Sequence, residues 1–385
     1  MKYFLIIIAA LGGFLGYGFW LEHEADKALA VEINKLLAPR ESNYSEYLTT
    51  AFAGNITLSA GEDRITVPQK LSGAWLEQFY RNYTKRIEYR VKSDAVVSYL
   101  TEIAPRFRIA PVNARFASAE NSIVESVPSF NGQSLNIQGS FASAMRAFSN
   151  GQSEVELATD AIEPEISLRK LEDMGITALL NTGQSSFKGS GSERIHNIKT
   201  GASKFDHTII QSGEEFSFNG RVGEVDAANG YLPGLVIKGN KLIPEYGGGL
   251  CQVSTTMFRA AMNAGLAIIE RRPHSLPVRF YNPQGFDATV YPGAADLRFR
   301  NDTQYPILIQ ANIKGSEIAF EFFGTPDGRT VDIKGPIVYE SNPDGSLKAV
   351  LNRTVTYADG SSKKDQFWSN YKSPGLFEVV RNPLE

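Results

Sequence analysis

The chain has 385 residues but only one cysteine, Cys251, and only four histidines. A single cysteine excludes an intrachain disulfide, so the fold has to rest on packed apolar cores. The charges nearly balance, with 39 Lys and Arg against 42 Asp and Glu. Because a net charge of −3 excludes a broadly basic surface, we expect no nucleic-acid partner.

The longest apolar run lies at the N-terminus, at residues 3–21. A helix of this length is about 30 Å long, the thickness of a bilayer core. Lys2 precedes the run and Phe19 and Trp20 close it, which predicts a single-pass membrane anchor at residues 1–21 and an extracytoplasmic remainder. A cleaved signal peptide is the alternative, although bulky aromatics stand where a cleavage site needs small residues.

The rest of the chain changes pattern from region to region. Residues 22–46 predict a polar helical linker, and residues 47–172 alternate strand-like and helix-like segments as in a small α+β domain. A mixed α/β domain follows, and residues 325–385 predict a β-rich C-terminal extension with Asp-Gly turns. We therefore expect an α+β protein with an N-terminal transmembrane helix.

Three local expectations concern segments inside these regions. Residues 72–82 have helical spacing. Residues 181–193 are rich in Gly and Ser and predict a loop or linker. Residues 223–250 predict a long, glycine-rich and only partly structured loop, of the kind that usually serves a functional site.

The only cysteine follows three glycines, in Gly247-Gly248-Gly249-Leu250-Cys251. Beyond it, apolar residues recur at three- and four-residue steps, which predicts a helix over residues 251–264. Glycine permits a positive φ ahead of the helix, and the first turn of a helix carries free N–H groups and about half a positive charge. Both features favour a thiolate at Cys251, and the thiolate is the nucleophilic form of cysteine.

Two further candidate side chains follow this helix. Pro273 fixes its own φ and disfavours helix at the preceding residue, so we expect His274 on a rigid, extended segment. Asp287 lies in an alternating segment. The alternation predicts strands at residues 266–269, 278–281 and 286–291.

These segments together resemble the VanW family, named after a gene in vancomycin-resistance clusters. The resemblance rests on residues 247–256, 270–278 and 285–290, with a supporting match at 215–219, and it extends over about residues 181–324. It implies an extracytoplasmic, cell-wall-associated protein that has peptidoglycan or its stem peptides as partner. In VanW-type chains a peptidoglycan-binding domain stands where residues 47–172 lie here, and residues 130–136 resemble its turn before a helix.

Cys251, His274 and Asp287 supply the residue types of a nucleophile, a general base and a group that fixes the tautomer of the base. The amides of Cys251 and Gln252 are candidate oxyanion donors. The residues expected to bind substrate are Gly248, Gly249, Gln252, Ser254 and Thr255. We expect no cofactor and no metal, because one Cys and one His leave a zinc ligand set incomplete.

A purely structural role is the competing interpretation of each residue. A lone cysteine after glycines can be a small apolar plug, since free cysteine is among the most buried residue types. His274 can bond a loop carbonyl, and Asp287 can cap the turn before it. Two hypotheses therefore stay open: a peptidase or transpeptidase acting on peptidoglycan peptides, and a non-catalytic peptidoglycan-binding or scaffold module.

Overall fold

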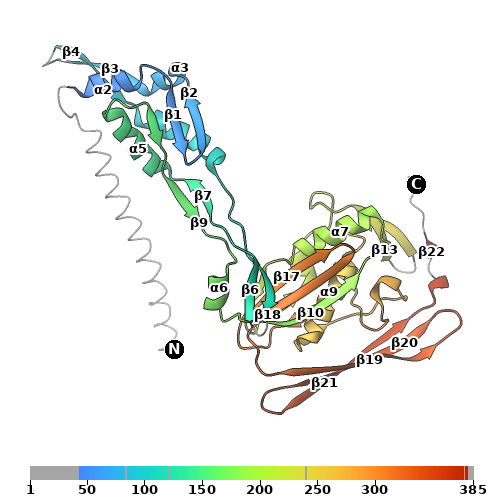
Figure 1. Cartoon of the computed structure of the whole chain (residues 1–385). Helices are drawn as coiled ribbons and strands as arrows, with labels where there is room; N and C mark the ends of the chain where they lie inside the picture. The colour runs from blue at the N-terminus through green and yellow to red at the C-terminus, as the bar shows by residue number, and fades with distance from the viewer. Residues whose placement is uncertain (1–42, 83–84, 120–121, 239–240, 377, 380–385) are drawn as a thin grey trace, which may run out of the picture. The chain divides into compact units, whose positions relative to one another are not determined.

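The computed structural model describes residues 43–379, apart from 83–84, 120–121, 239–240 and 377 (Figure 1). The predicted anchor at residues 1–21 and nearly all of the linker at 22–46 lie outside the described residues. Among those that are described, no helix is long and apolar enough to cross a membrane. The architecture is α+β, as the sequence predicts.

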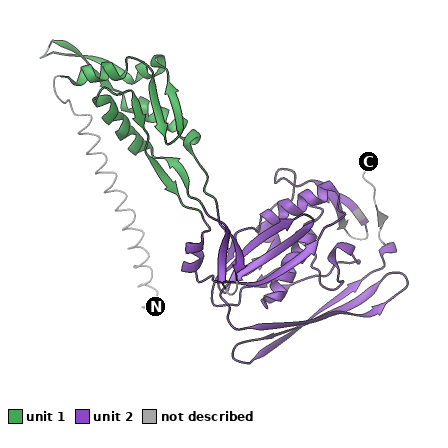
Figure 2. Cartoon of the chain, in the orientation of Figure 1, with its two compact units in different colours: residues 1–112, 130–164 green, residues 113–129, 165–385 purple. Residues whose placement is uncertain are grey.

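The chain divides into two compact units (Figure 2). Unit 1 comprises residues up to 112 together with 130–164, and unit 2 comprises residues 113–129 and 165–385. The chain thus enters unit 2 briefly, as a two-stranded ribbon, before it completes unit 1. The domain limits stated above stay predictions.

Unit 1 packs helices against short sheets. Strand β1 pairs antiparallel with β2 and parallel with β8. Helix α5 begins at the N-cap Asn136, whose side chain accepts from the Gly139 amide, and it buries one apolar face in the core of the unit. Its elements are α2 (Tyr44–Ala51), β1 (Ile56–Ala60), β2 (Asp63–Val67), α3 (Gln69–Ser72), η1 (Gly73–Trp75), β3 (Leu76–Arg81), β4 (Arg86–Val91), α4 (Ser93–Ile103), η2 (Ala104–Phe107), β7 (Gly132–Leu135), α5 (Ile137–Ser149), β8 (Glu154–Glu156) and β9 (Thr159–Ile162).

Unit 2 is built on a four-stranded antiparallel sheet of order β10-β18-β17-β11. Its elements are β5 (Arg115–Ala119), β6 (Ser122–Val127), α6 (Leu168–Asp173), β10 (Ala178–Ser186), α7 (Ser192–Ser203), β11 (Thr208–Ile210), β12 (Glu215–Ser217), α8 (Phe218–Val222), β13 (Pro233–Lys238), β14 (Lys241–Tyr246), α9 (Leu250–Asn263), β15 (Ala267–Glu270), η3 (Arg279–Tyr281), β16 (Arg298–Arg300), β17 (Ile307–Lys314), β18 (Glu317–Gly324), β19 (Thr330–Ser341), β20 (Leu347–Thr356), β21 (Ser362–Tyr371), η4 (Pro374–Leu376) and β22 (Glu378–Val379).

Helix α9 is the central element of unit 2. It packs against β10 and β18, and every residue from Gln252 to Met262 is buried. The helix approaches β10 closely at Gly183, where a Cβ would overlap the backbone of Ala260. Such a helix, buried on all sides, holds its first turn rigidly in place.

Several sequence expectations are corrected here. The helix predicted over residues 72–82 is wrong beyond Trp75, because Leu76–Arg81 pairs with β4 as a strand. The loop predicted at 181–193 is wrong in its first half, which belongs to β10. Residues 278–281 form the single turn η3, and residues 286–291 form isolated bridges in place of a strand. The region 223–250 contains the hairpin β13–β14.

The helix predicted at 251–264 is confirmed as α9, and the C-terminal region is β-rich as predicted. Strands β19, β20 and β21 form an antiparallel three-stranded meander (Figure 1). Its inner face packs against the core of unit 2 through Leu351 and Phe367. The meander is therefore part of the body of unit 2.

Candidate functional site

The glycine run delivers Cys251 to the second position of α9. Gly249 is the N-cap residue, with φ of 120°, a conformation that glycine adopts without strain. The Gln252 amide donates to the Gly249 carbonyl at 2.9 Å, so the predicted oxyanion role of that amide is disfavoured. The Cys251 amide has no acceptor among the described residues and stays free for a ligand.

His274 is held by Asp287 from two directions. The backbone amide of His274 donates to Oδ2 of Asp287 at 2.9 Å, and Nδ1 of the ring lies 2.5 Å from the same oxygen. The ring also stacks on Tyr281 with 4.5 Å between centroids. These contacts fix the position and the tautomer of the imidazole.

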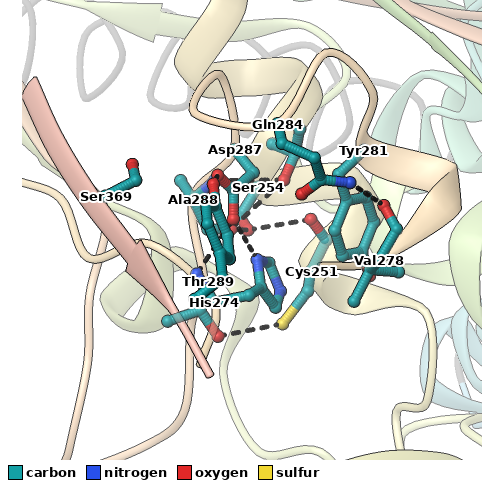
Figure 3. Close-up of polar contacts among 12 residues, drawn as sticks. Cys251, Ser254, His274, Val278, Tyr281, Gln284, Asp287, Ala288, Thr289 and Ser369 are labelled. Carbon is teal, nitrogen blue, oxygen red and sulfur yellow. Dashed lines mark hydrogen bonds and ion pairs between the residues drawn. The ribbon is translucent and has the colours of Figure 1, made fainter. Parts of the chain in front are cut away.

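The second ring nitrogen of His274, Nε2, differs from Nδ1 in its hydrogen bonding. Nε2 is buried and has no hydrogen-bond partner within the described part of the chain. Figure 3 shows the sulfur of Cys251 beside the ring. The sulfur lies 3.5 Å from Oγ1 of Thr289 and 3.6 Å from the carbonyl oxygen of Val290. A buried nitrogen without a partner is rare in proteins, and here it faces the only thiol of the chain.

Asp287 is fully buried, and its charge is compensated on all sides. Besides His274, its carboxylate accepts from the Tyr371 hydroxyl at 2.5 Å and from the Arg271 guanidinium at 3.2 Å. Burial alone raises the pKa of Asp287, but the hydrogen bonds and the charges of His274 and Arg271 outweigh it and hold that pKa well below its usual range. Asp287 is therefore ionised at neutral pH.

The thiol and the imidazole shift each other's proton affinity. Burial raises the pKa of Cys251, whereas the adjacent positive charge of His274 lowers it, and the result lies below the ordinary value. Burial likewise lowers the pKa of His274, but the contacts with Asp287 and Cys251 raise it to about 9. The geometry thus favours a thiolate–imidazolium pair at neutral pH.

A cavity of about 660 Å³ lies in front of this pair. Gly249, Cys251 and His274 are among its lining residues, and the remaining wall is mostly apolar. Two arginines of the lining, Arg194 and Arg279, lie over the ring of Phe280, at 4.1 and 4.8 Å from its centroid. An apolar cavity with few convergent polar groups is typical of a small-molecule or peptide site.

The predicted substrate-binding residues fall into two groups. Gly249 lines the cavity, and Gly248 approaches the backbone of Gly234 too closely to allow a side chain. Gln252, Ser254 and Thr255 are fully buried and bonded to protein. The hydroxyl groups of Ser254 and Thr255 donate to the Ala288 carbonyl at 2.6 and 3.3 Å.

These buried bonds tie α9 to the segment that carries Asp287. They place the helix start and the carboxylate in one rigid frame, and they lie behind the thiol, outside the cavity lining. No group of three or more His, Cys, Asp or Glu in the described ranges could hold a metal ion.

Sequence reasoning missed two partners of Asp287. Arg271 lies in the charge run before His274 and was available as a signal, since a buried carboxylate needs a cation. Tyr371 lies 84 residues after Asp287, in a strand without any local motif. Only the three-dimensional structure brings it to the site.

Comparisons with solved structures give weak similarity. An L,D-transpeptidase carbamoyl enzyme formed with avibactam superposes with a TM-score of 0.21 and 12% identity, over 32% of this chain and 47% of that one. A mutant Enterococcus faecium L,D-transpeptidase gives a TM-score of 0.22 and 12% identity, over 37% and 52% of the two chains. At these scores the comparison carries no argument about fold or activity.

Sequence comparisons are more informative. The uncharacterized protein YoaR of Bacillus subtilis is 35% identical over 178 residues, which are 46% of this chain and 58% of YoaR. The vancomycin B-type resistance protein VanW of Enterococcus faecalis is 33% identical over 135 residues, 34% of this chain and 49% of that protein. The chain thus spans about half the length of these curated relatives. The family model described as "VanW like protein" matches residues 193–323, so the chain contains a domain similar to the VanW family.

Proposed function

We propose that this protein is a membrane-anchored, extracytoplasmic enzyme that transfers acyl groups of peptidoglycan stem peptides through Cys251. The observation that carries the proposal is the buried Nε2 of His274, which lies beside the Cys251 sulfur and has no other hydrogen-bond partner among the described residues, with Asp287 on the opposite nitrogen. The name of the Enterococcus faecalis relative, a vancomycin resistance protein, supports a cell-wall substrate.

The first step forms a thioester. The Cys251 thiolate attacks the carbonyl carbon of a peptide bond, and the oxyanion that develops accepts from the free Cys251 amide. The imidazolium of His274 then gives the Nε2 proton to the leaving amine as the C–N bond breaks. Asp287 stabilises the imidazolium and stays ionised.

The second step releases the acyl group. Water, in hydrolysis, or the amine of a second stem peptide, in transpeptidation, attacks the thioester carbonyl while Nε2 of His274 accepts the proton of the nucleophile. The C–S bond breaks and the sulfur leaves as thiolate, so both residues return to their starting states.

The two arginines of the cavity lining suit a substrate with free carboxylates, and Glu245 of the same lining accepts from the Tyr291 hydroxyl. Neither Arg194 nor Arg279 forms an ion pair with a carboxylate of the described chain, although Arg194 does donate to Oε1 of Gln252 at 2.9 Å. Stem peptides carry free carboxylates, and an arginine binds a carboxylate with two parallel hydrogen bonds.

One observation favours a non-catalytic peptidoglycan-binding module instead. The Val290 carbonyl oxygen lies 3.6 Å from the sulfur, so a neutral thiol has an acceptor in the folded protein. In that case Cys251 is a half-buried structural residue and the cavity only binds wall peptide.

Incubation with purified muropeptides distinguishes the two functions. An enzyme forms a thioester adduct on Cys251 that mass spectrometry detects, together with cleaved or cross-linked products, and Cys251→Ala abolishes both. Binding of muropeptides by the wild-type chain without any adduct or product, and unchanged binding by Cys251→Ala, establishes the binding module.

The anchor at residues 1–21 is tested separately. Cell fractionation of the full chain and of a chain that lacks these residues locates each in the membrane or in soluble material. We expect the full chain in the membrane fraction after alkaline extraction, and its recovery in the soluble fraction contradicts the anchor.

A further inference from the structure

Tyr371 is the last residue of β21, and it reaches the candidate site from outside the segment that matches the family. The match ends at residue 323, whereas β21 spans Ser362–Tyr371. The Tyr371 hydroxyl donates to Oδ1 of Asp287 at 2.5 Å and accepts from the Gly285 amide at 2.7 Å. With 1% of its surface exposed, Tyr371 has no room to adopt another position.

Residues next to Tyr371 in the chain contact the segment that carries Arg271 and His274. The Lys372 amide donates to the Ser275 carbonyl at 2.7 Å, next to His274. The Arg271 guanidinium donates to Oγ of Ser369 at 3.0 Å and to the carbonyl oxygen of Trp368 at 3.1 Å. The end of β21 therefore touches both segments that carry the imidazole and the carboxylate.

The meander has little freedom to move away from these contacts. Arg353 of β20 is buried and donates to the Leu266 carbonyl at 2.9 Å, directly after α9. Phe367 of β21 contacts the ring of Phe258 in α9, with centroids 5.8 Å apart. The same helix that presents the thiol thus anchors the strand that holds the carboxylate.

We infer that the C-terminal meander completes the catalytic unit, with Tyr371 as the positioning residue that fixes the carboxylate of Asp287 for His274. The inference rests on the proposed function, because a positioned base matters only for an activated thiol. The charged or titratable groups bonded to this carboxylate are His274, Arg271 and Tyr371, and Arg259 of α9 interacts with it electrostatically.

The test is the variant Tyr371→Phe in the full chain, with Tyr339→Phe as control. Tyr339 lies on the same meander but is 52% exposed, so the control removes a hydroxyl group without touching Asp287. The measurement is the rate of Cys251 alkylation by iodoacetamide as a function of pH, together with Tm. A purely structural hydroxyl lowers Tm but leaves the pH profile unchanged.

We expect the alkylation midpoint of Tyr371→Phe to move to higher pH by about one unit, which is about a tenfold loss of thiolate below the midpoint. The control keeps the wild-type midpoint. If Tyr371→Phe does not fold, Ser369→Ala, which removes a bond to Arg271 and the contact of Ser369 with Tyr371, is expected to shift the midpoint in the same direction by less.

An unchanged midpoint in the folded variant overturns the inference. It leaves the proposed function intact if wild-type Cys251 still reacts at a pH below that of an ordinary thiol. If the wild-type thiol itself titrates like a free cysteine, the proposed function fails and takes the inference with it.

Discussion

The two ring nitrogens of His274 lie in different hydrogen-bonding environments. On the Nδ1 side, Asp287 is fully buried and accepts hydrogen bonds from His274, Tyr371 and Arg271. On the Nε2 side, the nitrogen has no hydrogen-bond partner in the described chain and faces a thiol at the wall of a cavity.

The difference assigns separate roles to the two nitrogens: Nδ1 orients the ring, and Nε2 takes part in the reaction. Buried polar groups are nearly always satisfied, because an unsatisfied one costs about 1 to 3 kcal/mol. Nδ1 of His274, which fixes the ring, follows this rule. Nε2, which has to transfer a proton, does not have such a set of hydrogen bonds. The neighbour of this nitrogen is the Cys251 sulfur, with which it forms the thiolate–imidazolium pair, so this side of the ring takes part in the reaction.

Replacing Asp287 removes the hydrogen bonds on the Nδ1 side of His274, and we expect the largest effect from this change. Asp287→Asn removes the charge that holds the imidazolium and leaves Arg271 uncompensated. We expect acyl transfer to fall by about 10⁴-fold and the free energy of unfolding to fall by about 3 kcal/mol. Muropeptide turnover and urea denaturation measure the two effects. Turnover within tenfold of wild type contradicts the role of Asp287.

The pH dependence of thioester formation tests the Nε2 side of the His274 ring. The pKa of His274 is raised from its ordinary value to about 9, so the imidazolium is present below that pH and is lost as pH rises through it. We expect the rate of thioester formation, which needs the Nε2 proton, to decline above about pH 9. A decline that is already complete near the ordinary histidine pKa of about 6.5 contradicts the paired state.

The smallest effect is expected from the cavity wall. Arg279→Gln removes one unpaired cation, so it should slow alkylation by iodoacetate, which carries a carboxylate, more than alkylation by neutral iodoacetamide. We expect the ratio of the two rates to fall about two- to fivefold at low salt. Arg169→Gln, an exposed arginine of α6 outside the cavity lining, is the matched control. Equal ratios in both variants exclude carboxylate recognition by Arg279.

Sequence reasoning succeeds where local pattern decides the structure. The apolar spacing after Cys251 predicts α9, because a helix buried on all sides keeps a regular pattern of small and apolar residues. Residue types and their order also indicate a Cys–His–Asp set. The structure brings His274 and Asp287 together, with Nδ1 2.5 Å from the carboxylate, and places Cys251 beside the ring.

Sequence reasoning fails where tertiary contacts decide the structure. The Gly- and Ser-rich residues of β10 resemble a loop, yet Gly183 allows the close approach of α9 and Ser185 bonds Gln252 at 2.6 Å. The strand predicted at 278–281 is a turn whose Tyr281 carbonyl accepts from the buried Arg259 at 2.8 Å. Tyr371 has no local signal, since its partner lies 84 residues away.

The most direct test of the account is the titration of the Cys251 thiolate by its ultraviolet absorbance, in the wild type and in His274→Ala. Because the chain has one cysteine, the difference between its titration and that of Cys251→Ala, which keeps the same 16 tyrosines, belongs to this residue. The account predicts that the wild-type thiolate is already formed at neutral pH and that in His274→Ala its midpoint rises to the ordinary thiol value of about 8.5 or above. Identical titrations at about pH 8.5 in both proteins contradict it.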